Sequence, residues 1–270
     1  IFLVLTLATG GLALWVRHSL SSSLETIGDP FSSIPTRAPE QQVADGREAA
    51  TNILVLGTDS RTSAGDPSQW EAGAQRTDAI MIMQISGNKK DVSVMSIPRD
   101  SWVDVPGHGD GKINAAYSYG GPLLTIQTVE NLTGIRISHF VIADFESFQN
   151  LTDELGGVII NLKEPQTLAG TKFPDGAQLL NGKQALAYTR ERKSLPGGDF
   201  DRVKRQRTWM RAIVRQTLTS GTLSNPTRLY SFLKTATQTV AVDESFTIDE
   251  MQSLALGLRG LHSNDISFMT

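Results

Sequence analysis

Two aspartates and one arginine stand at the ends of three apolar segments that we predict to be strands. The segments are 52–56, 79–85 and 92–97. Asp59 follows the first segment, Asp78 directly precedes the second, and Arg99 follows the third. If the strands form an antiparallel meander, the end of one lies beside the start of the next. We therefore expect Asp59, Asp78 and Arg99 to share one edge of a sheet.

Paired carboxylates at such an edge suit a divalent cation. Mg²⁺, with Mn²⁺ as an alternative, is commonly bound through one or two carboxylates together with substrate phosphates. Asp59 and Asp78 are therefore candidate metal ligands. The competing interpretation is structural, because aspartate at a strand end is often a turn former or a cap.

A second charged cluster contains several arginines around a predicted helix over residues 202–219. Arg202, Arg205 and Gln206 are spaced to reach one side of its first turn. The amino end of a helix already attracts anions, so arginines there indicate a bound polyanion such as pyrophosphate, which guanidinium groups bind bidentately. The alternative is a solvated basic face, to which we assign Lys204, Arg207, Arg211 and Arg215.

A third feature is the segment 112–117, which reads KINAAY. Lys112 and Asn114 could contact a phosphate or a sugar. They could equally cap the helix that follows, and their spacing alone does not decide between the two roles.

Composition excludes several other chemistries. The chain has no cysteine, which removes disulfides, thiolate zinc sites and a cysteine nucleophile. It has no GxSxG or HExxH motif, its four histidines lack metal-ligand spacing, and the GHGDGK segment is not a phosphate-binding P-loop. The basic helix raises the possibility of a DNA-binding regulator, but the net charge of −3 and the lack of a helix-turn-helix signal argue against nucleic acid as a partner.

The amino-terminal residues predict membrane attachment. Residues 1–16 are uncharged and apolar, slightly fewer than the roughly 20 residues that span a bilayer. We interpret them as a truncated transmembrane anchor, with the remnant of a signal peptide as the alternative. Residues 17–50 have the serine and proline content of a linker, and residues 51–270 form the expected catalytic domain, outside the cytoplasm on a single-pass membrane protein.

The hydrophobic pattern predicts an α/β fold in which helices sandwich a central mixed β-sheet. Further strands are expected at 139–145, 157–162 and 265–269, and helices at 122–132, 147–155, 182–192 and 202–219, with one or two more within 226–258. The segment 79–85 is apolar on both alternating faces, so helices should cover this strand on both sides.

Seven motifs in chain order resemble the LytR–CpsA–Psr family. They are NILVLGTDSR, RTDAIMIMQI, VSVMSIPRDS, KINAAYSYGG, GGVIINL, LNGKQALAYTRER and DFDRVKRQR, which together span roughly residues 52–218. Each motif is modest alone, and the ordered series is specific. One departure is the insert at residues 62–75, which is longer than in many relatives and could reshape the mouth of a pocket.

The resemblance implies a phosphotransferase that moves a glycopolymer phosphate from a polyprenyl-pyrophosphate carrier onto a muramic acid hydroxyl of peptidoglycan. It also implies a hydrophobic pocket for the polyprenyl chain and assigns magnesium to Asp59 and Asp78. The pyrophosphate-binding residues that it implies are Arg76, Arg99, Arg190, Arg192, Arg202 and Gln206, with Arg61 and Lys112 as weaker matches. Asp78 and Arg99 are the catalytic candidates, and an aspartate is favoured as the base because arginine is a poor one.

Two alternatives use the same residues differently. A metal-dependent polyprenyl pyrophosphatase would have water as the acceptor, and a lipid- or polymer-binding wall protein would have no turnover. The sequence does not distinguish teichoic acid, capsule and arabinogalactan as the glycopolymer.

Overall fold

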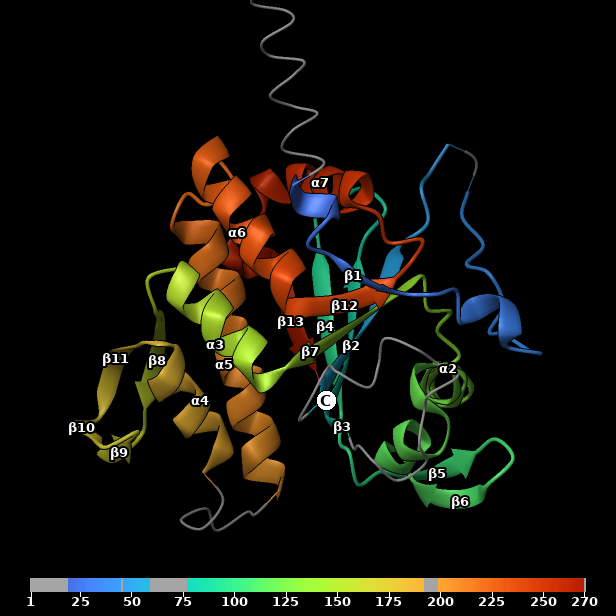
Figure 1. The fold of residues 1–270 in the computed structure, drawn as a ribbon, viewed down its shortest axis with the longest axis horizontal. Helices are drawn as coiled ribbons and strands as arrows, with labels where there is room; N and C mark the ends of the chain where they lie inside the picture. The colour runs from blue at the N-terminus through green and yellow to red at the C-terminus, as the bar shows by residue number, and fades with distance from the viewer. Residues whose placement is uncertain (1–18, 45, 59–76, 192–198, 270) are drawn as a thin grey trace, which may run out of the picture.

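A seven-stranded mixed sheet runs through the middle of the molecule in the order β1-β12-β7-β2-β3-β4-β13 (Figure 1). The computed structural model describes residues 19–44, 46–58, 77–191 and 199–269. The strands of this sheet are β1 (Glu25–Ile27), β2 (Thr51–Thr58), β3 (Thr77–Ile85), β4 (Val92–Ile97), β7 (His139–Asp144), β12 (Val240–Asp243) and β13 (Ile266–Met269). The mixed sheet expected from the sequence is confirmed.

The central strands form the predicted antiparallel meander. Val55 of β2 pairs with Met81 of β3, and Ile82 of β3 pairs with Met95 of β4. On the outer sides of this meander, β7 lies parallel to β2 and β13 lies parallel to β4. The antiparallel pairs bring the end of β2, the start of β3 and the end of β4 to one edge of the sheet.

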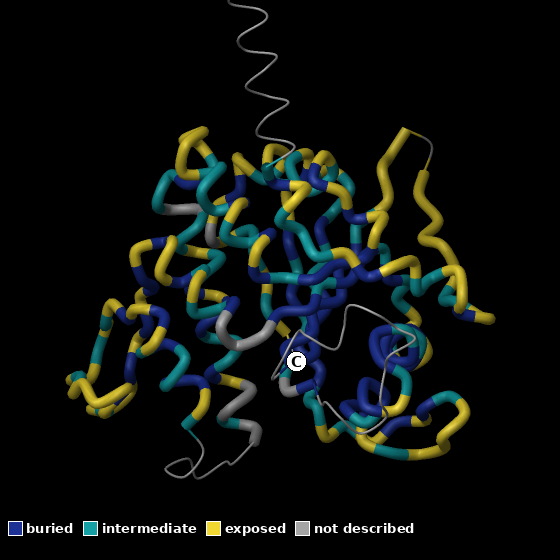
Figure 2. Tube along the Cα trace, in the orientation of Figure 1, coloured by how far each residue is buried: buried dark blue, intermediate teal, exposed yellow. Residues whose placement is uncertain are grey.

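Helices cover both faces of the sheet, as the pattern of residues 79–85 predicted. Ile80 and Ile82 of β3 belong to a core that α2 closes, whereas Met81 and Ile85 face a second core that contains Met210 of α5 and residues of α7. The helices are α2 (Asn114–Thr133), α3 (Phe145–Glu154), α4 (Gly182–Arg190), α5 (Asp199–Thr219), α6 (Pro226–Thr239) and α7 (Ile248–Gly257). Figure 2 shows the buried residues concentrated along the strands between these layers.

The helix α2 is broken in the middle by two glycines. Gly121 has φ 61° and ψ −150°, a conformation that side chains with a Cβ rarely adopt, and Gly120 is also non-helical. Pro122 then begins the second half, where its fixed φ suits a first helical turn. The prediction of a helix from residue 122 therefore found the second half and missed the first.

Six short strands lie outside the main sheet as two-stranded ribbons. They are β5 (Trp102–Val105) with β6 (Gly109–Lys112), β8 (Val158–Leu162) with β11 (Gly176–Leu180), and β9 (Gln166–Leu168) with β10 (Thr171–Phe173). The strand predicted at 157–162 is thus present, but it pairs only with β11 among the described residues and packs against α5. The hairpin of β5 and β6 was not predicted.

The chain before residue 51 contributes to the folded domain. β1 extends the sheet beside β12, and Ile27 and Ile34, which flank the short 3-10 helix η1 (Phe31–Ser33), are buried in the core that α2 closes. These residues lie in the stretch that the sequence analysis expected to be linker. The apolar residues 1–16 lie outside the described residues, and within the described ranges no helix is long and apolar enough to cross a membrane.

A buried carboxylate fastens this amino-terminal segment to the domain. Glu130 of α2, whose side chain is 1% exposed, forms an ion pair with Arg37. Its carboxylate also accepts hydrogen bonds from the backbone N–H groups of Ala38 and Ile137, at 2.9 and 2.8 Å. Three donors from two separate segments therefore converge on one buried group.

A second buried cluster joins β7, β12 and the start of α7. His139 lies 3.2 Å from Asp243 through Nδ1 and 3.2 Å from Glu250 through Nε2, and its ring stacks on Phe246. Asp243 also accepts a hydrogen bond from the backbone N–H of Phe140 at 2.9 Å. Burial lowers the pKa of His139, but the two carboxylates outweigh this effect, so the pKa lies above its ordinary value.

Glu130→Ala is expected to destabilise the protein by about 3 kcal/mol, because it leaves two backbone N–H groups without an acceptor and removes the carboxylate partner of Arg37, whose side chain is 14% exposed. The measurement is urea unfolding followed by circular dichroism. Glu40→Ala is the matched control, since Glu40 pairs with Arg136 at 3.4 Å on the same segment but is 82% exposed. Glu40→Ala should lower the free energy of unfolding by less than about 0.5 kcal/mol. Similar losses in the two variants would contradict the proposal that Glu130 holds the amino-terminal segment against α2.

The raised pKa of His139 predicts a pH dependence of the free energy of unfolding. A histidine whose pKa is higher in the folded state stabilises the protein below the unfolded value of about 6.5, and the contribution is lost as the pH rises through the folded-state pKa. Stability should therefore fall as the pH is raised from about 6, and His139→Gln should flatten this slope. His262→Gln is the control, because the side chain of His262 is 85% exposed; a slope that persists in His139→Gln would refute the assignment.

Candidate functional site

The predicted edge of the sheet is present. Thr58 at the end of β2 pairs with Thr77 at the start of β3, and Ile80 of β3 pairs with Ile97 at the end of β4. Asp78 therefore lies at this edge as a backbone position, and Arg99 follows two residues after Ile97. The convergence of three chain segments that the sequence analysis expected is confirmed for the backbone.

A third aspartate position at the same edge was missed. Asp144 is the last residue of β7, where it pairs with Thr58 in the parallel register. Parallel strands end at the same edge of a sheet, so the rule that selected Asp59 after β2 applies equally to Asp144 after β7. Its sequence signal, an aspartate closing the apolar run 139–143, was available.

The helix α5 brings Gln206 to this edge. Gln206 lines a narrow space with Gly57 of β2, Ala79 of β3 and Thr189 of α4. On its other side it lines a second narrow space that also contains Ser96 and Arg207. Gln206 therefore lies beside Gly57 near the end of β2 and beside Ala79, the residue after Asp78 in β3.

Arg207 was assigned to the solvated face of α5, and this assignment is corrected. Lys204, Arg211 and Arg215 are exposed, but Arg207 is only partly exposed and borders the space beside Ser96 and Ile97. It adds a guanidinium at the end of β4 that helical periodicity alone did not select.

Two buried hydroxyl groups lie at this edge without a hydrogen-bond partner among the described residues. They are the Oγ1 atom of Thr77 and the Oγ atom of Ser96, in residues that are 0% and 4% exposed. Buried polar groups are nearly always paired. Both hydroxyl oxygens are therefore available for a further hydrogen bond at this edge.

The backbone around Arg99 is held by the start of α2. The carbonyl of Arg99 accepts a hydrogen bond from the N–H of Asn114 at 3.2 Å, and the carbonyl of Ser101 accepts one from Ile113 at 2.9 Å. The Arg99 Nε atom lies 3.7 Å from Asp100, which also pairs with Lys112 at 2.7 Å. This chain of charges places Arg99 and Lys112 on either side of one carboxylate.

The open question about Lys112 and Asn114 is resolved against helix capping. Asn114 is the first residue of α2, and no side chain caps the helix at Ile113. Lys112 ends β6, and its side chain is 56% exposed beside Asp100. Lys112 therefore remains near the candidate site, but as a neighbour of Arg99 and not as a helix cap.

Arg190 is the last residue of α4, and it is exposed. A cation in the last turn also complements the helix dipole, so its position fits both a structural role and anion binding. Directly before it, Thr189 borders the same narrow space as Gln206. The carboxyl end of α4 therefore approaches the candidate edge.

Arg205 has a structural role, which corrects the expectation that it shares the anion-binding side of α5. It is 8% exposed, donates a hydrogen bond from Nη1 to the carbonyl of Tyr188 at 3.1 Å, and lies over the Tyr188 ring at 4.6 Å. It thereby joins α5 to the end of α4, two residues before Arg190.

The remaining predicted site residues lie outside what the structure describes. Asp59, Arg61, Arg76 and Arg192 fall in segments that are not described, and for Asp78 and Arg202 only the backbone is described. Within the described residues, no three histidine, aspartate or glutamate side chains are grouped so as to hold a metal. The prediction of a magnesium site at Asp59 and Asp78 stays a prediction.

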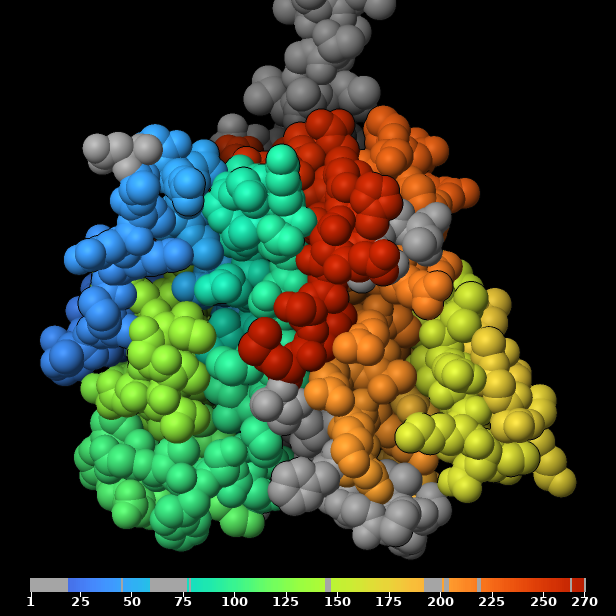
Figure 3. Space-filling view, turned by 180° about the vertical axis from the view of Figure 1, so that it is seen from behind, coloured from blue at the N-terminus to red at the C-terminus, as the bar shows by residue number. Residues whose placement is uncertain are grey.

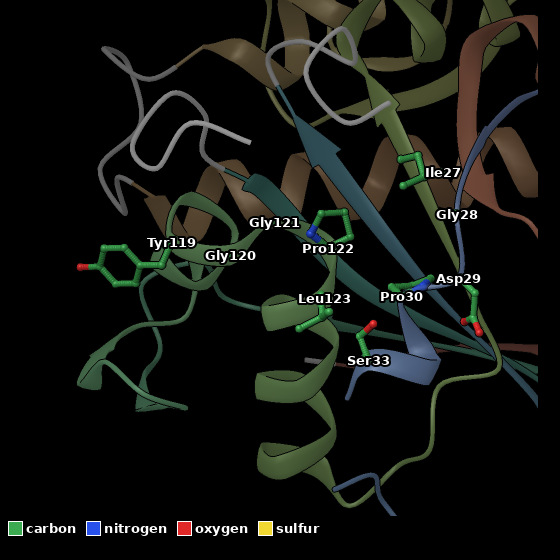
Figure 4. A pocket seen from close by; sticks show the side chains of 10 residues that line it. All are labelled: Ile27, Gly28, Asp29, Pro30, Ser33, Tyr119, Gly120, Gly121, Pro122 and Leu123. Atoms are coloured by element: carbon green, nitrogen blue, oxygen red, sulfur yellow. The ribbon is translucent and has the colours of Figure 1, made fainter. Parts of the chain in front are cut away.

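A larger cavity of about 410 Å³ lies on the α2 side of the sheet (Figure 4). It is bounded by the break in α2 and by the segment from β1 to η1. Its lining is mostly apolar, with Ile27, Pro30, Pro122 and Leu123 among the contributing residues. Among the described residues that line it there is no histidine, lysine or arginine, which distinguishes it from the charged edge.

The ordered motifs and this sheet edge correspond to one known family. The model of the LytR_cpsA_psr family matches residues 26–270. The chain belongs to this family. The match begins within β1, consistent with the place of that strand in the sheet.

Relatives in the family are cell-wall proteins. The chain is 38% identical over 230 residues to the probable cell wall biosynthesis protein LcpB of Corynebacterium glutamicum. The alignment covers 82% of this chain and 55% of LcpB. It is 31% identical over 258 residues to the polyisoprenyl-teichoic acid–peptidoglycan teichoic acid transferase TagU of Bacillus subtilis, covering 95% and 79%. The chain spans about half the length of LcpB and of the related LcpA, 55% and 51%.

Solved structures of family members have the same fold. TagV of B. subtilis is 28% identical, with a TM-score of 0.67 over 82% of this chain and 83% of that one. TagT bound to LI-WTA is 25% identical, with a TM-score of 0.65 over 86% and 82%.

Arg205→Ala in this family member is expected to lower the free energy of unfolding by about 2 kcal/mol, because it leaves a buried carbonyl unpaired and removes the packing on Tyr188. Lys204→Ala is the control, since Lys204 is exposed and makes an i,i+3 pair with Asp201 at 3.1 Å. Its expected cost is below about 0.5 kcal/mol in the same urea titration. An Arg205→Ala variant with native stability and no activity would instead place Arg205 in the site.

Proposed function

We propose that this domain transfers a glycopolymer phosphate from a polyprenyl-pyrophosphate donor to a hydroxyl group of peptidoglycan. Membership of the LytR_cpsA_psr family and similarity to TagU support a transferase acting in the cell wall. The observation that carries the proposal is the convergence of Arg207, Gln206 and the end of α4 on one sheet edge, where Arg99 follows the end of β4 by two residues. A site so rich in guanidinium groups suits a doubly phosphorylated substrate.

The reaction exchanges one phosphorus–oxygen bond for another. The acceptor hydroxyl oxygen bonds to the phosphorus that carries the glycopolymer, and the bond from that phosphorus to the bridging oxygen breaks. Polyprenyl phosphate leaves with the bonding electron pair, and the hydroxyl proton passes to a base, for which we propose Asp78. Phosphoryl transfer of this type depends mainly on positioning and on stabilisation of developing charge.

Arg99 is suited to stabilise the leaving phosphate because its position is fixed before substrate binds. Its backbone is hydrogen-bonded to the start of α2, and its side chain is 21% exposed beside Asp100. A preorganised cation costs little rearrangement during the reaction. Arg190, the last residue of α4, and Arg202, in the first turn of α5, are proposed to bind the second phosphate.

The donors available at the edge fit Mg²⁺ as a cofactor, with Mn²⁺ as an alternative. Asp59 and Asp78 would hold the ion, and the unpaired hydroxyls of Thr77 and Ser96 add further oxygen atoms at the same edge. An oxygen-only donor set is the one that Mg²⁺ prefers. When bound, the ion would neutralise phosphate charge.

The polyprenyl part of the donor needs an apolar surface next to the charged edge. The narrow space beside Gln206 continues between Met81 of β3 and Met210 and Trp209 of α5. Methionine side chains are flexible and adapt to irregular ligands. We propose that this layer opens to accept the lipid, which would keep the domain at the outer face of the membrane that carries the donor.

Arg99→Ala is expected to lower the transfer rate at least about 100-fold, because removal of one preorganised transition-state donor typically costs that much. The assay combines the chain, including β1, with a polyprenyl-pyrophosphate-linked sugar and soluble peptidoglycan fragments, and follows the sugar–phosphate–peptidoglycan adduct by mass spectrometry. Chelation of divalent metal should abolish the adduct.

Arg215→Ala is the matched control, an exposed arginine on α5 away from the edge, and should retain activity within twofold. Release of free sugar phosphate without an adduct would replace the transferase with a pyrophosphatase. Lipid binding with no turnover, unaffected by Arg99→Ala, would leave a non-enzymatic binding protein.

A further inference from the structure

The outer face of the β5–β6 hairpin carries one exposed aromatic side chain among polar ones. Trp102 is 69% exposed, the highest fraction among the large hydrophobic residues that the structure describes as exposed. It pairs across the strands with Lys112, and Asp104 pairs with Asp110. All four residues are exposed. An indole combines a large apolar ring with a polar N–H group, and for this reason tryptophan is enriched at binding interfaces.

The hairpin is a rigid support for this face. Its inner residues Val103 and Val105 are buried in the core that α2 closes. Pro106 and Gly107, which has φ 77°, form a type II turn closed by a hydrogen bond of 2.8 Å from His108 to Val105. The ring of His108 then stacks on Tyr119 of α2 at 4.5 Å, so both the turn and the inner face are held.

The hairpin is joined directly to the candidate site. Trp102 follows Arg99 by three residues, so their Cα atoms lie within about 11 Å of each other. Asp100 lies between them in the sequence and pairs with Lys112 of the opposite strand at 2.7 Å. In Figures 1 and 3 the hairpin with α2 and the lower part of α5 lie on opposite sides of the same end of the molecule.

We propose that Trp102 stacks against a neutral pyranose ring of the acceptor glycan, and that the outer face of the β5–β6 hairpin is the acceptor-binding surface of the transferase. This inference rests on the function proposed above. The C–H groups on one face of a pyranose carry partial positive charge and pack on the negative face of an indole. Asp104, Asp110 and Lys112 supply acceptors and donors for the surrounding sugar hydroxyl and amide groups.

The charges on the face select this occupant over the others. Asp104 and Asp110 outnumber Lys112, which already pairs with Asp100, so this face would repel the phosphates of the donor and the anionic headgroups of a membrane. One aromatic ring within a polar surface is too small an apolar area for a stable protein interface. A neutral sugar ring satisfies both the aromatic surface and the polar rim, and a glycan bound here would extend toward Arg99.

The division of the site into two sides follows from these positions. Arginines and Gln206 on α4 and α5 face the phosphates of the donor, and the hairpin presents the acceptor from the opposite side. Arg99 lies at the junction, with its backbone hydrogen-bonded to the start of α2 behind the hairpin. An acceptor held by Trp102 would therefore bring its hydroxyl group to the phosphorus beside Arg99.

The test measures acceptor binding separately from turnover. Chitotetraose, a neutral chain of N-acetylated pyranose rings, is titrated into the 270-residue chain and followed by calorimetry and by indole NMR signals. Trp102→Ala should weaken binding about tenfold, and Trp102→Phe should restore most of it. In the transfer assay, Trp102→Ala should raise KM for the peptidoglycan fragment by a similar factor, with kcat and the KM for the lipid donor unchanged.

Leu179→Ala is the matched control, because Leu179 is 59% exposed on the β8–β11 ribbon and should leave both measurements unchanged. Unfolding curves for all variants check the fold. Unaltered chitotetraose affinity in Trp102→Ala would overturn the proposal, as would a loss of binding to anionic liposomes with acceptor affinity retained. The titration needs no catalysis, so it tests the acceptor surface separately from the transferase. If chitotetraose binding depends on Trp102 but the chain has no transfer activity, the proposed transferase function is refuted and the proposed glycan-binding surface is supported.

Discussion

The antiparallel pairing of β3 with both β2 and β4 determines where every other part of the site lies. β3 is apolar on both faces and is buried between α2 on one side and α5 with α7 on the other. A register slip of one residue would exchange its two faces and move Met81 from one core to the other. Since both cores are closed by helices, the register is fixed, and the same sheet edge must carry the end of β2, the start of β3 and the end of β4.

The buried ionic groups lie away from this edge and fasten the periphery of the sheet. Glu130 holds the segment before β2 against α2, and His139 joins β7 to Asp243 of β12 and to α7. A buried charge is costly unless several donors or acceptors meet it, and each of these groups has at least two. They make the docking of peripheral segments specific, and they leave the buried hydroxyl groups of Thr77 and Ser96 and the partly exposed Arg99 and Arg207 at the charged edge.

The central meander of β2, β3 and β4 could be predicted because periodicity and the placement of Asp59, Asp78 and Arg99 at strand ends are local signals. β12 was missed, since it lies within the range 226–258 where only helices were expected. The direction of individual side chains on α5 could not. Arg205 and Gln206 are adjacent in sequence, yet Arg205 is buried against Tyr188 while Gln206 borders the sheet edge. Helical spacing gives relative angles between side chains, but the packing partner that fixes the absolute orientation comes from α4, a separate part of the chain.

The short elements were missed for a related reason. β1 has three residues and β5 has four, too few for an alternating pattern to stand out, and each is stabilised by tertiary partners instead of by its own sequence. The β5–β6 hairpin exists because Val103 and Val105 reach the core under α2, and its opposite face then necessarily points Trp102 into solvent. Burial of one face of a strand thus fixes the exposure of the other, and in this hairpin it places an indole and two carboxylates on the exposed face of a strand that begins three residues after Arg99. The acceptor surface and the anion site are therefore consequences of the same constraint, since both are attached to the end of β4 whose register β3 sets.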